Sequence, residues 1–122
     1  MGYCIEFALR AGTLEAVVSG KASEPLARFI ARDIAEEAAR LAAKRLLIDV
    51  RRLRDRLGSL GSLARLPRQA KPRRIALVDV REFDSYYAFP ELAARRRGAQ
   101  MRRFPDPNAA MKWLCEPTDH LS

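Results

Sequence analysis

The chain has 122 residues, of which 23 are lysine or arginine and 15 aspartate or glutamate, giving a formal net charge of +8. Its hydrophobic content of 48% suits one folded domain with a core and excludes a disordered or collagen-like chain. With only two cysteines and one histidine, the chain cannot form a disulfide scaffold or most kinds of metal site. It has no signal-peptide pattern and no long apolar stretch, which predicts a cytoplasmic protein without a membrane span.

The first 20 residues predict a β-hairpin. Apolar side chains alternate over residues 3–9, a second apolar run covers 14–20, and Ala11-Gly12 supplies the turn between them. The hairpin carries few charges, and sparsely charged edge strands tend to pair with other strands. We therefore expect a homodimer formed through this hairpin. The apolar side chains available for that contact are Tyr3, Ile5 and Phe7.

An amphipathic helix is predicted to follow the hairpin. Ser23 is a suitable N-cap, Pro25 fits the first turn, and apolar residues recur at spacings of three and four to about Ala43. The predicted inward face consists of Leu26, Phe29, Ile30, Ile34, Ala38 and Leu41. The opposite face carries charges of both signs, which favours packing on a sheet over binding to a membrane surface.

Two short apolar runs, at residues 45–50 and 74–80, predict strands that are buried on both faces, as in a parallel sheet. A basic stretch over 51–56 follows the first run and leads to a short helix at about 58–66. A third helix is predicted at about 86–97, after the second run. This alternation of strands and helices indicates right-handed crossovers in a mostly parallel sheet.

The C-terminal part predicts an edge strand at 100–104 and a last helix that begins at Asp106-Pro107 and continues through Cys115. Its core-facing residues are predicted to be Ala109, Ala110, Trp113 and Leu114. The order is therefore β-β-α-β-α-β-α-β-α, an α/β fold with an N-terminal hairpin. We expect one domain over residues 1–116 and a flexible tail over 117–122.

Three stretches in a fixed order carry a resemblance to a known family. They are Leu47-Ile48-Asp49-Val50-Arg51, Arg74-Ile75-Ala76-Leu77-Val78-Asp79, and the ending that runs from Ala93-Ala94-Arg95-Arg96-Arg97-Gly98 to Ala110-Met111-Lys112-Trp113-Leu114. With the order of elements, they resemble the STAS fold of anti-sigma-factor antagonists, and more closely the bacterial SpoIIAA-like proteins, a branch that also resembles CRAL-TRIO lipid-binding domains. In the antagonists, a segment like Asp-Ser-Ser-Gly contains a regulated serine. Here Val50-Arg51-Arg52 follows Asp49, so that serine has no counterpart.

The basic excess is concentrated in one segment. Residues 51–74 hold nine basic residues and one acidic residue, a difference of +8 that equals the net charge of the whole chain. An anionic partner would account for this excess, and so would a compositional preference for arginine. In open parallel sheets, ligands bind beyond the carboxyl ends of the strands. The candidate ligand-binding or anion-binding residues there are Arg51, Arg52, Arg54, Arg56, Ser59, Ser62, Asp49 and Asp79.

Each of these candidates has a plainer alternative. The arginines could form a solvated basic loop, and Asp49 and Asp79 could bond to backbone amides of the residues that follow them. Ser59 and Ser62 are also candidate phosphorylation sites, because they lie near the expected start of a helix. The glycines around them lack the Gly-Lys-Ser/Thr ending of a phosphate-binding P-loop.

The sequence shows no arrangement of catalytic groups. His120 lies in the expected tail, and Cys4 and Cys115 have no neighbouring base, so we interpret both cysteines as small buried apolar residues. We therefore predict no enzyme, cofactor or metal site. The expected function is a non-catalytic regulatory or binding module whose basic loop docks an acidic protein or an anionic small ligand. The alternatives are a carrier of a small or lipidic ligand and, less favoured, a nucleic-acid-binding accessory protein.

Overall fold

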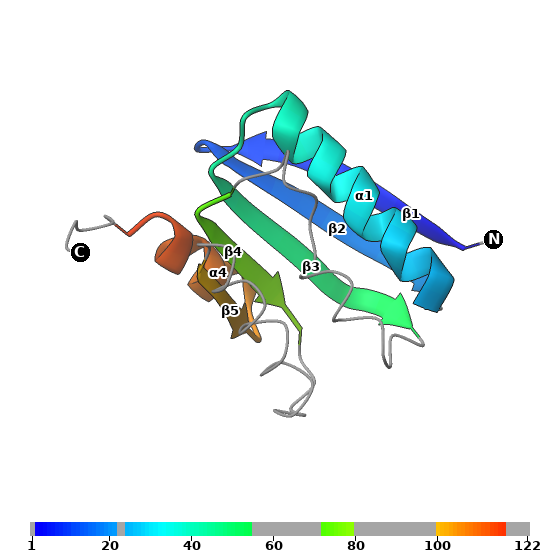
Figure 1. The fold of residues 1–122 in the computed structure, drawn as a ribbon. Coiled ribbons are helices and arrows are strands. Elements are labelled where there is room, and N and C mark those ends of the chain that lie inside the picture. Colours follow the sequence, from blue (N-terminus) through cyan, green and yellow to red (C-terminus); the bar gives the residue numbers. More distant parts are fainter. Residues whose placement is uncertain (1, 22–23, 55–71, 80–99, 117–122) are drawn as a thin grey trace.

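The described part of the chain comprises residues 2–21, 24–54, 72–79 and 100–116 of a computed structural model. It contains five strands and two helices (Figure 1). Several predictions lie outside these ranges: the N-cap Ser23, the helices at 58–66 and 86–97, and the tail at 117–122.

The strands form one sheet in which the spatial order is the chain order, β1-β2-β3-β4-β5. β1 (Tyr3–Arg10) pairs antiparallel with β2 (Thr13–Lys21). β3 (Arg45–Arg54), β4 (Arg74–Val78) and β5 (Gln100–Phe104) each pair parallel with the strand before them. The predicted α/β class, with an N-terminal hairpin on a mostly parallel sheet, is therefore confirmed.

Both ends of the hairpin depend on glycine. At the turn, Ala11 and Gly12 have φ angles of 50° and 77°, the left-handed pair that a two-residue hairpin turn requires. At the other end, Gly20 has a φ of 108°, and a Cβ atom at this position would collide with the carbonyl oxygen of Gly2. The same oxygen accepts a hydrogen bond of 3.0 Å from the backbone N–H of Lys21. Gly20 therefore allows the start of β1 to approach the end of β2.

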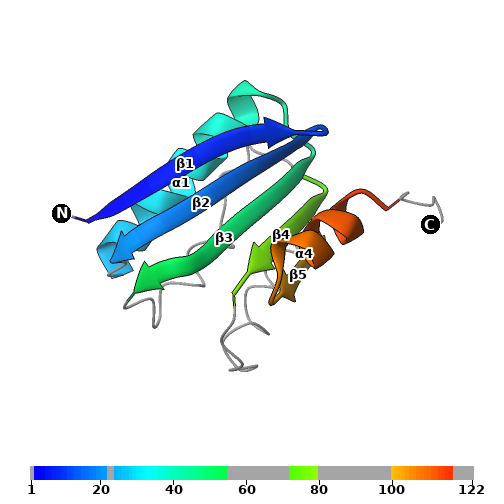
Figure 2. The ribbon, with the colours of Figure 1, turned by 180° about the vertical axis from the view of Figure 1, so that it is seen from behind.

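The two helices cover opposite faces of the sheet. α1 (Glu24–Arg40) lies on one face, and α4 (Pro107–Leu114) lies on the other (Figures 1 and 2). The core on the α1 face includes Leu14, Ala16, Val18, Ile30, Ile34, Ala38, Leu46, Ile48, Val50, Ile75 and Leu77. The core on the α4 face contains Leu47, Ala76, Val78, Phe104, Ala110, Trp113 and Leu114. Burial on both faces explains the nearly continuous apolar runs in β3 and β4.

Four side chains differ from the sequence-based expectation. Phe29 is not part of the inward face: it is 46% exposed at the flank of α1, where the guanidinium of Arg32 lies 5.0 Å from its ring. Cys4 and Cys115 are exposed thiols, so their interpretation as buried residues was wrong. Cys4 alternates with inward-facing residues of β1, and Cys115 follows the last turn of α4. Ala109 is exposed as well, because it precedes the buried stripe of that helix.

β3 is longer than predicted. The apolar run ends at Val50, but the strand continues through Arg54. The first part of the predicted basic loop is therefore strand, in which Arg52, Leu53 and Arg54 pair with β2. Backbone pairing with β2 maintains the extended conformation there in spite of the charged side chains.

A β-bulge marks this extension. Val17 of β2 pairs with Asp49, whereas Ser19 pairs with Arg52, so β3 advances by three residues where β2 advances by two. The extra residue reverses the alternation of side chains along β3. As a result Leu53 is buried in the core on the α1 face, where a regular strand would have placed it on the other face.

Candidate functional site

The candidate residues that the structure describes lie in the second half of β3 and directly after β4. Asp49 lies in β3 opposite Val78 of β4, and Asp79 follows directly, so the two carboxylates come from adjacent positions on neighbouring strands. Arg51 and Arg52 continue β3 beyond Asp49. These residues therefore occupy neighbouring backbone positions where the pairing of β3 with β4 ends, and a shared ligand site formed by them stays a prediction.

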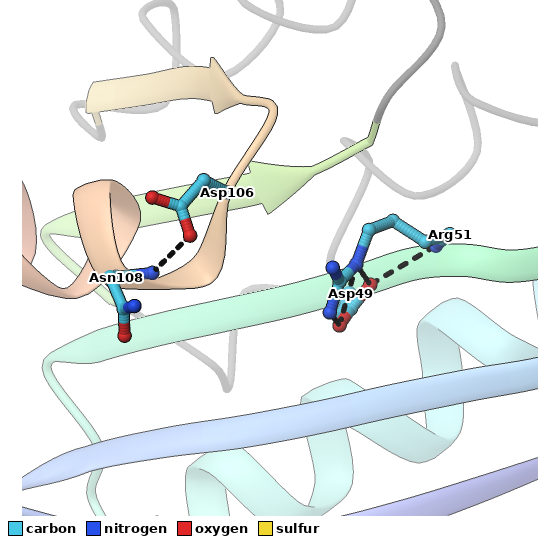
Figure 3. Close-up of polar contacts among 4 residues, drawn as sticks. All are labelled: Asp49, Arg51, Asp106 and Asn108. Atoms are coloured by element: carbon cyan, nitrogen blue, oxygen red, sulfur yellow. Dashed lines mark hydrogen bonds and ion pairs between the residues drawn. The ribbon is translucent and has the colours of Figure 1, made fainter.

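Arg51 forms a two-pronged ion pair with Asp49 (Figure 3). Its Nε donates to Oδ1 at 3.0 Å and to Oδ2 at 3.2 Å, and its Nη2 donates to Oδ2 at 2.8 Å. The backbone N–H of Arg51 also donates to Oδ1 at 3.1 Å. The alternative in which Asp49 bonds to a following backbone amide is therefore confirmed, with the guanidinium as an additional partner. Arg51 neutralises a buried carboxylate, and its role as a ligand for an anion stays a prediction.

The pair is charged at neutral pH. Burial alone would raise the pKa of the Asp49 carboxyl, but the hydrogen bonds from Arg51 and the positive charges of Arg51 and Arg52 outweigh it, so this pKa lies below its ordinary value. The hydrogen bond to Asp49 raises the pKa of the Arg51 guanidinium, against the opposing effect of burial. Two opposite charges are thus fixed side by side in β3, where its pairing with β4 ends.

Asp79 is fully buried where β4 ends. Its backbone N–H donates to the carbonyl of Phe104 at 2.9 Å, and its own carbonyl accepts a hydrogen bond of 3.3 Å from Nη1 of Arg103. These contacts join the carboxyl ends of β4 and β5. The role of Asp79 in binding a ligand stays a prediction.

Asp106 supplies a third carboxylate near the Asp49–Arg51 pair, and it was not among the candidate residues predicted from the sequence. Asp106 was predicted as the N-cap of the last helix, and it does accept hydrogen bonds from the backbone N–H groups of Asn108 at 3.0 Å and Ala109 at 3.4 Å. Its negative charge also contributes to the raised pKa of Arg51 (Figure 3). The available signal was its place two residues after β5, since the residues that follow parallel strands lie at one end of the sheet.

Arg74, the last residue of the basic segment, is the first residue of β4 and contacts α4 at the end of the sheet where the parallel strands start. Its Nη1 donates to the carbonyl of Trp113 at 2.6 Å and to that of Glu116 at 3.1 Å, and so ties the start of β4 to the C-terminal end of α4. The guanidiniums of Arg74 and Arg102 lie 5.2 and 5.6 Å from the Trp113 ring. Part of the basic excess is therefore engaged within the molecule, at Arg51 and at Arg74.

Arg52 is the exposed arginine beside the Asp49–Arg51 pair. Arg54 is the last residue of β3. Arg56, Ser59 and Ser62 lie outside the described residues, and their roles as anion ligands or phosphorylation sites stay predictions. Within the described ranges, no group of three or more His, Cys, Asp or Glu side chains could hold a metal ion. The helices described here are too short or too polar to cross a membrane.

Comparisons with known proteins identify the fold. No family model matches the sequence, and no curated protein matches it. An anti-sigma factor antagonist from Mycobacterium paratuberculosis superposes with a TM-score of 0.64 at 14% identity, over 94% of this chain and 96% of that one. An uncharacterised DUF3478 protein with a SpoIIAA-like fold, from Shewanella loihica PV-4, superposes with a TM-score of 0.55 at 19% identity, over 93% and 94%. The chain therefore has the STAS/SpoIIAA-like fold that the sequence resemblance implied.

Proposed function

We propose that this protein is a non-catalytic regulatory module that binds an acidic partner protein at the carboxyl end of β3. The observation that carries the proposal is the fold shared, over 94% of the chain, with a protein described as an anti-sigma factor antagonist. Such a role needs a docking surface and no catalytic group. The exposed Arg52, next to the fixed Asp49–Arg51 pair, provides the described part of such a surface.

The charge of the adjoining sequence determines the kind of partner. From Arg52 to Lys71 the chain contains six basic residues and one acidic residue, a balance of +5 that excludes both Arg51 and Arg74. A localised positive field attracts acidic protein surfaces and accelerates their association. Phosphorylation of Ser59 or Ser62 would add negative charge to this segment and oppose the same partner. That would place a switch after the strand, because Val50-Arg51 occupies the position where the antagonists have their serine.

The proposal can be tested by crosslinking from position 52 and then measuring binding with purified proteins. A photoreactive amino acid replaces Arg52 in cells that make the protein, and the captured partner is identified and purified. Binding is then titrated for the wild type, Arg52→Glu and Arg73→Glu. Arg73 is the matched control, because it is also exposed but precedes β4 at the opposite edge of the sheet.

We expect an acidic partner whose affinity falls about tenfold or more with Arg52→Glu, falls less than about twofold with Arg73→Glu, and decreases with added salt. Equal losses in the two variants would contradict docking at this site. Tighter binding to a DNA duplex than to the captured protein would favour the nucleic-acid alternative. A co-purified lipid whose removal abolishes partner binding would favour the carrier alternative.

A further inference from the structure

The outer edge of β1 has no partner strand in the described sheet. The N–H of Lys21 donates to the carbonyl of Gly2, so in this antiparallel pair the even-numbered residues of β1 hydrogen-bond to β2. The backbone N–H and C=O groups of Ile5, Phe7 and Leu9 therefore point away from β2. Unpaired groups of this kind are a template for another strand.

An apolar patch accompanies this open edge. Two of the large apolar side chains exposed among the described residues lie on β1, Phe7 at 37% and Leu9 at 56%, and we call these two the edge patch. By alternation, Phe7 and Leu9 lie on the same face of β1 as Tyr3, which packs on the α1 side. The hydroxyl of Tyr3 donates a hydrogen bond of 2.6 Å to Oδ2 of Asp33 in α1. The flank of α1 that carries Asp33 therefore borders β1.

We propose that a second copy of this chain covers the edge patch, with the two β1 strands paired antiparallel around a two-fold axis at Ala8. In this register Phe7 lies opposite Leu9 of the second copy, and Leu9 opposite its Phe7. Both positions have outward-pointing backbone groups, so each of these pairs exchanges two hydrogen bonds. The two sheets become one continuous sheet, and the apolar side chains of both edge patches gather on its α1 face.

The charges of β1 select this register. With the axis at Ala8, Glu6 lies opposite Arg10 of the second copy on the face away from α1, and opposite charges in this position stabilise a strand pair. An axis at Glu6 would place two glutamates opposite each other, and an axis at Phe7 would leave both charges opposite uncharged residues. Arg10 is held on this face by Glu15, with 3.3 Å between Nε and Oε2.

This interface is independent of the proposed docking site. β2 separates β1 from β3, so the carboxyl end of β3 stays accessible in each copy (Figure 1). A dimer of this kind would present two docking sites to its partners.

A charge-swap series tests the pairing by sedimentation. At high concentration the wild type should sediment at twice the mass of the 13.8 kDa chain. Glu6→Arg and Arg10→Glu each place like charges opposite each other, and each should weaken dimerisation roughly tenfold, whereas the double variant Glu6→Arg/Arg10→Glu should restore it. Arg73→Glu, at a site far from β1, should leave the dimer unchanged. A monomer at every concentration, or a double variant as weak as the single ones, would overturn the proposal.

Single cysteines test the register. In a background of Cys4→Ser and Cys115→Ser, we expect Ala8→Cys to form a disulfide-linked dimer on mild oxidation, because residues on the axis form a close pair without backbone hydrogen bonds. Glu6→Cys and Phe7→Cys should remain unlinked, since their own copies lie farther along the strand. A crosslink in Glu6→Cys or Phe7→Cys, or none in Ala8→Cys, would overturn this register.

Discussion

Replacing Arg51 with alanine should destabilise the fold, and replacing Arg52 should not. Arg51→Ala removes the guanidinium from a carboxylate, Asp49, that is 7% exposed. Breaking a fully buried pair costs roughly 3–5 kcal/mol. Because the Arg51 side chain is 39% exposed, water can reach the vacated space, and the backbone N–H still donates to Asp49. We therefore expect about 1–2 kcal/mol for Arg51→Ala and less than about 0.5 kcal/mol for Arg52→Ala.

Urea unfolding followed by the fluorescence of Trp113, the only tryptophan of the chain, measures both changes. The folded-state pKa of Asp49 is depressed, so its contribution is complete above the ordinary aspartate pKa of about 4 and is lost as the pH falls through the depressed value. The difference between the wild type and Arg51→Ala should therefore shrink on acidification below about pH 4. Equal stability of Arg51→Ala and Arg52→Ala at pH 7, or a difference that persists unchanged into strong acid, would refute this reasoning.

Three further outcomes test the packing. Trp113→Ala should cost about 3–5 kcal/mol in urea unfolding followed by circular dichroism, because this ring is buried in the core on the α4 face; a loss below 1 kcal/mol would contradict it. The hydrogen bond that Tyr3 donates to Asp33, together with burial, raises the pKa of Tyr3 to about 12, so an ultraviolet titration should show one late tyrosine that Tyr3→Phe removes. The stability this bond provides should be present below about pH 10 and lost as the pH rises towards 12. Gly20→Ala should destabilise more than Gly12→Ala, because both have positive φ but only Gly20 meets a backbone atom at close range; equal thermal shifts would argue against the collision.

The sequence predicts best those elements whose start or turn is determined by residues adjacent in the chain. The hairpin turn follows from Ala11-Gly12, and the start of α4 follows from Asp106-Pro107, because turn and cap chemistry involve only neighbouring residues. The extension of β3 over residues 51–54 depends instead on pairing with β2, a contact distant in sequence that outweighs the loop-like composition. The exposure of Phe29 likewise depends on how far α1 covers the sheet, which helical periodicity alone does not determine.

The sequence indicates which part of the sheet the candidate residues occupy, but it does not indicate which contacts each of them makes. The rule that ligands bind at the carboxyl ends of parallel strands places Asp49 and Asp79 at one edge. The sequence does not distinguish Arg51, which binds Asp49, from the exposed Arg52, because the bulge that separates their roles arises from the register with β2. Nor could it assign Arg74 to the end of α4, since the carbonyl of Trp113 that it binds lies 39 residues away.

The agreement between strand order and chain order affects how the molecule can assemble during synthesis. Each described strand can add to the edge left by the one before it, and none has to insert between two strands that are already paired. The hairpin and α1 can thus bury apolar surface while the remainder is still being made. The face beneath α4 must wait until residues 107–114 leave the ribosome. A ribosome that stalls before α4 emerges would therefore hold a nascent chain in which Leu47, Ala76 and Val78 lack their packing partners from α4, the form in which a chaperone would meet it.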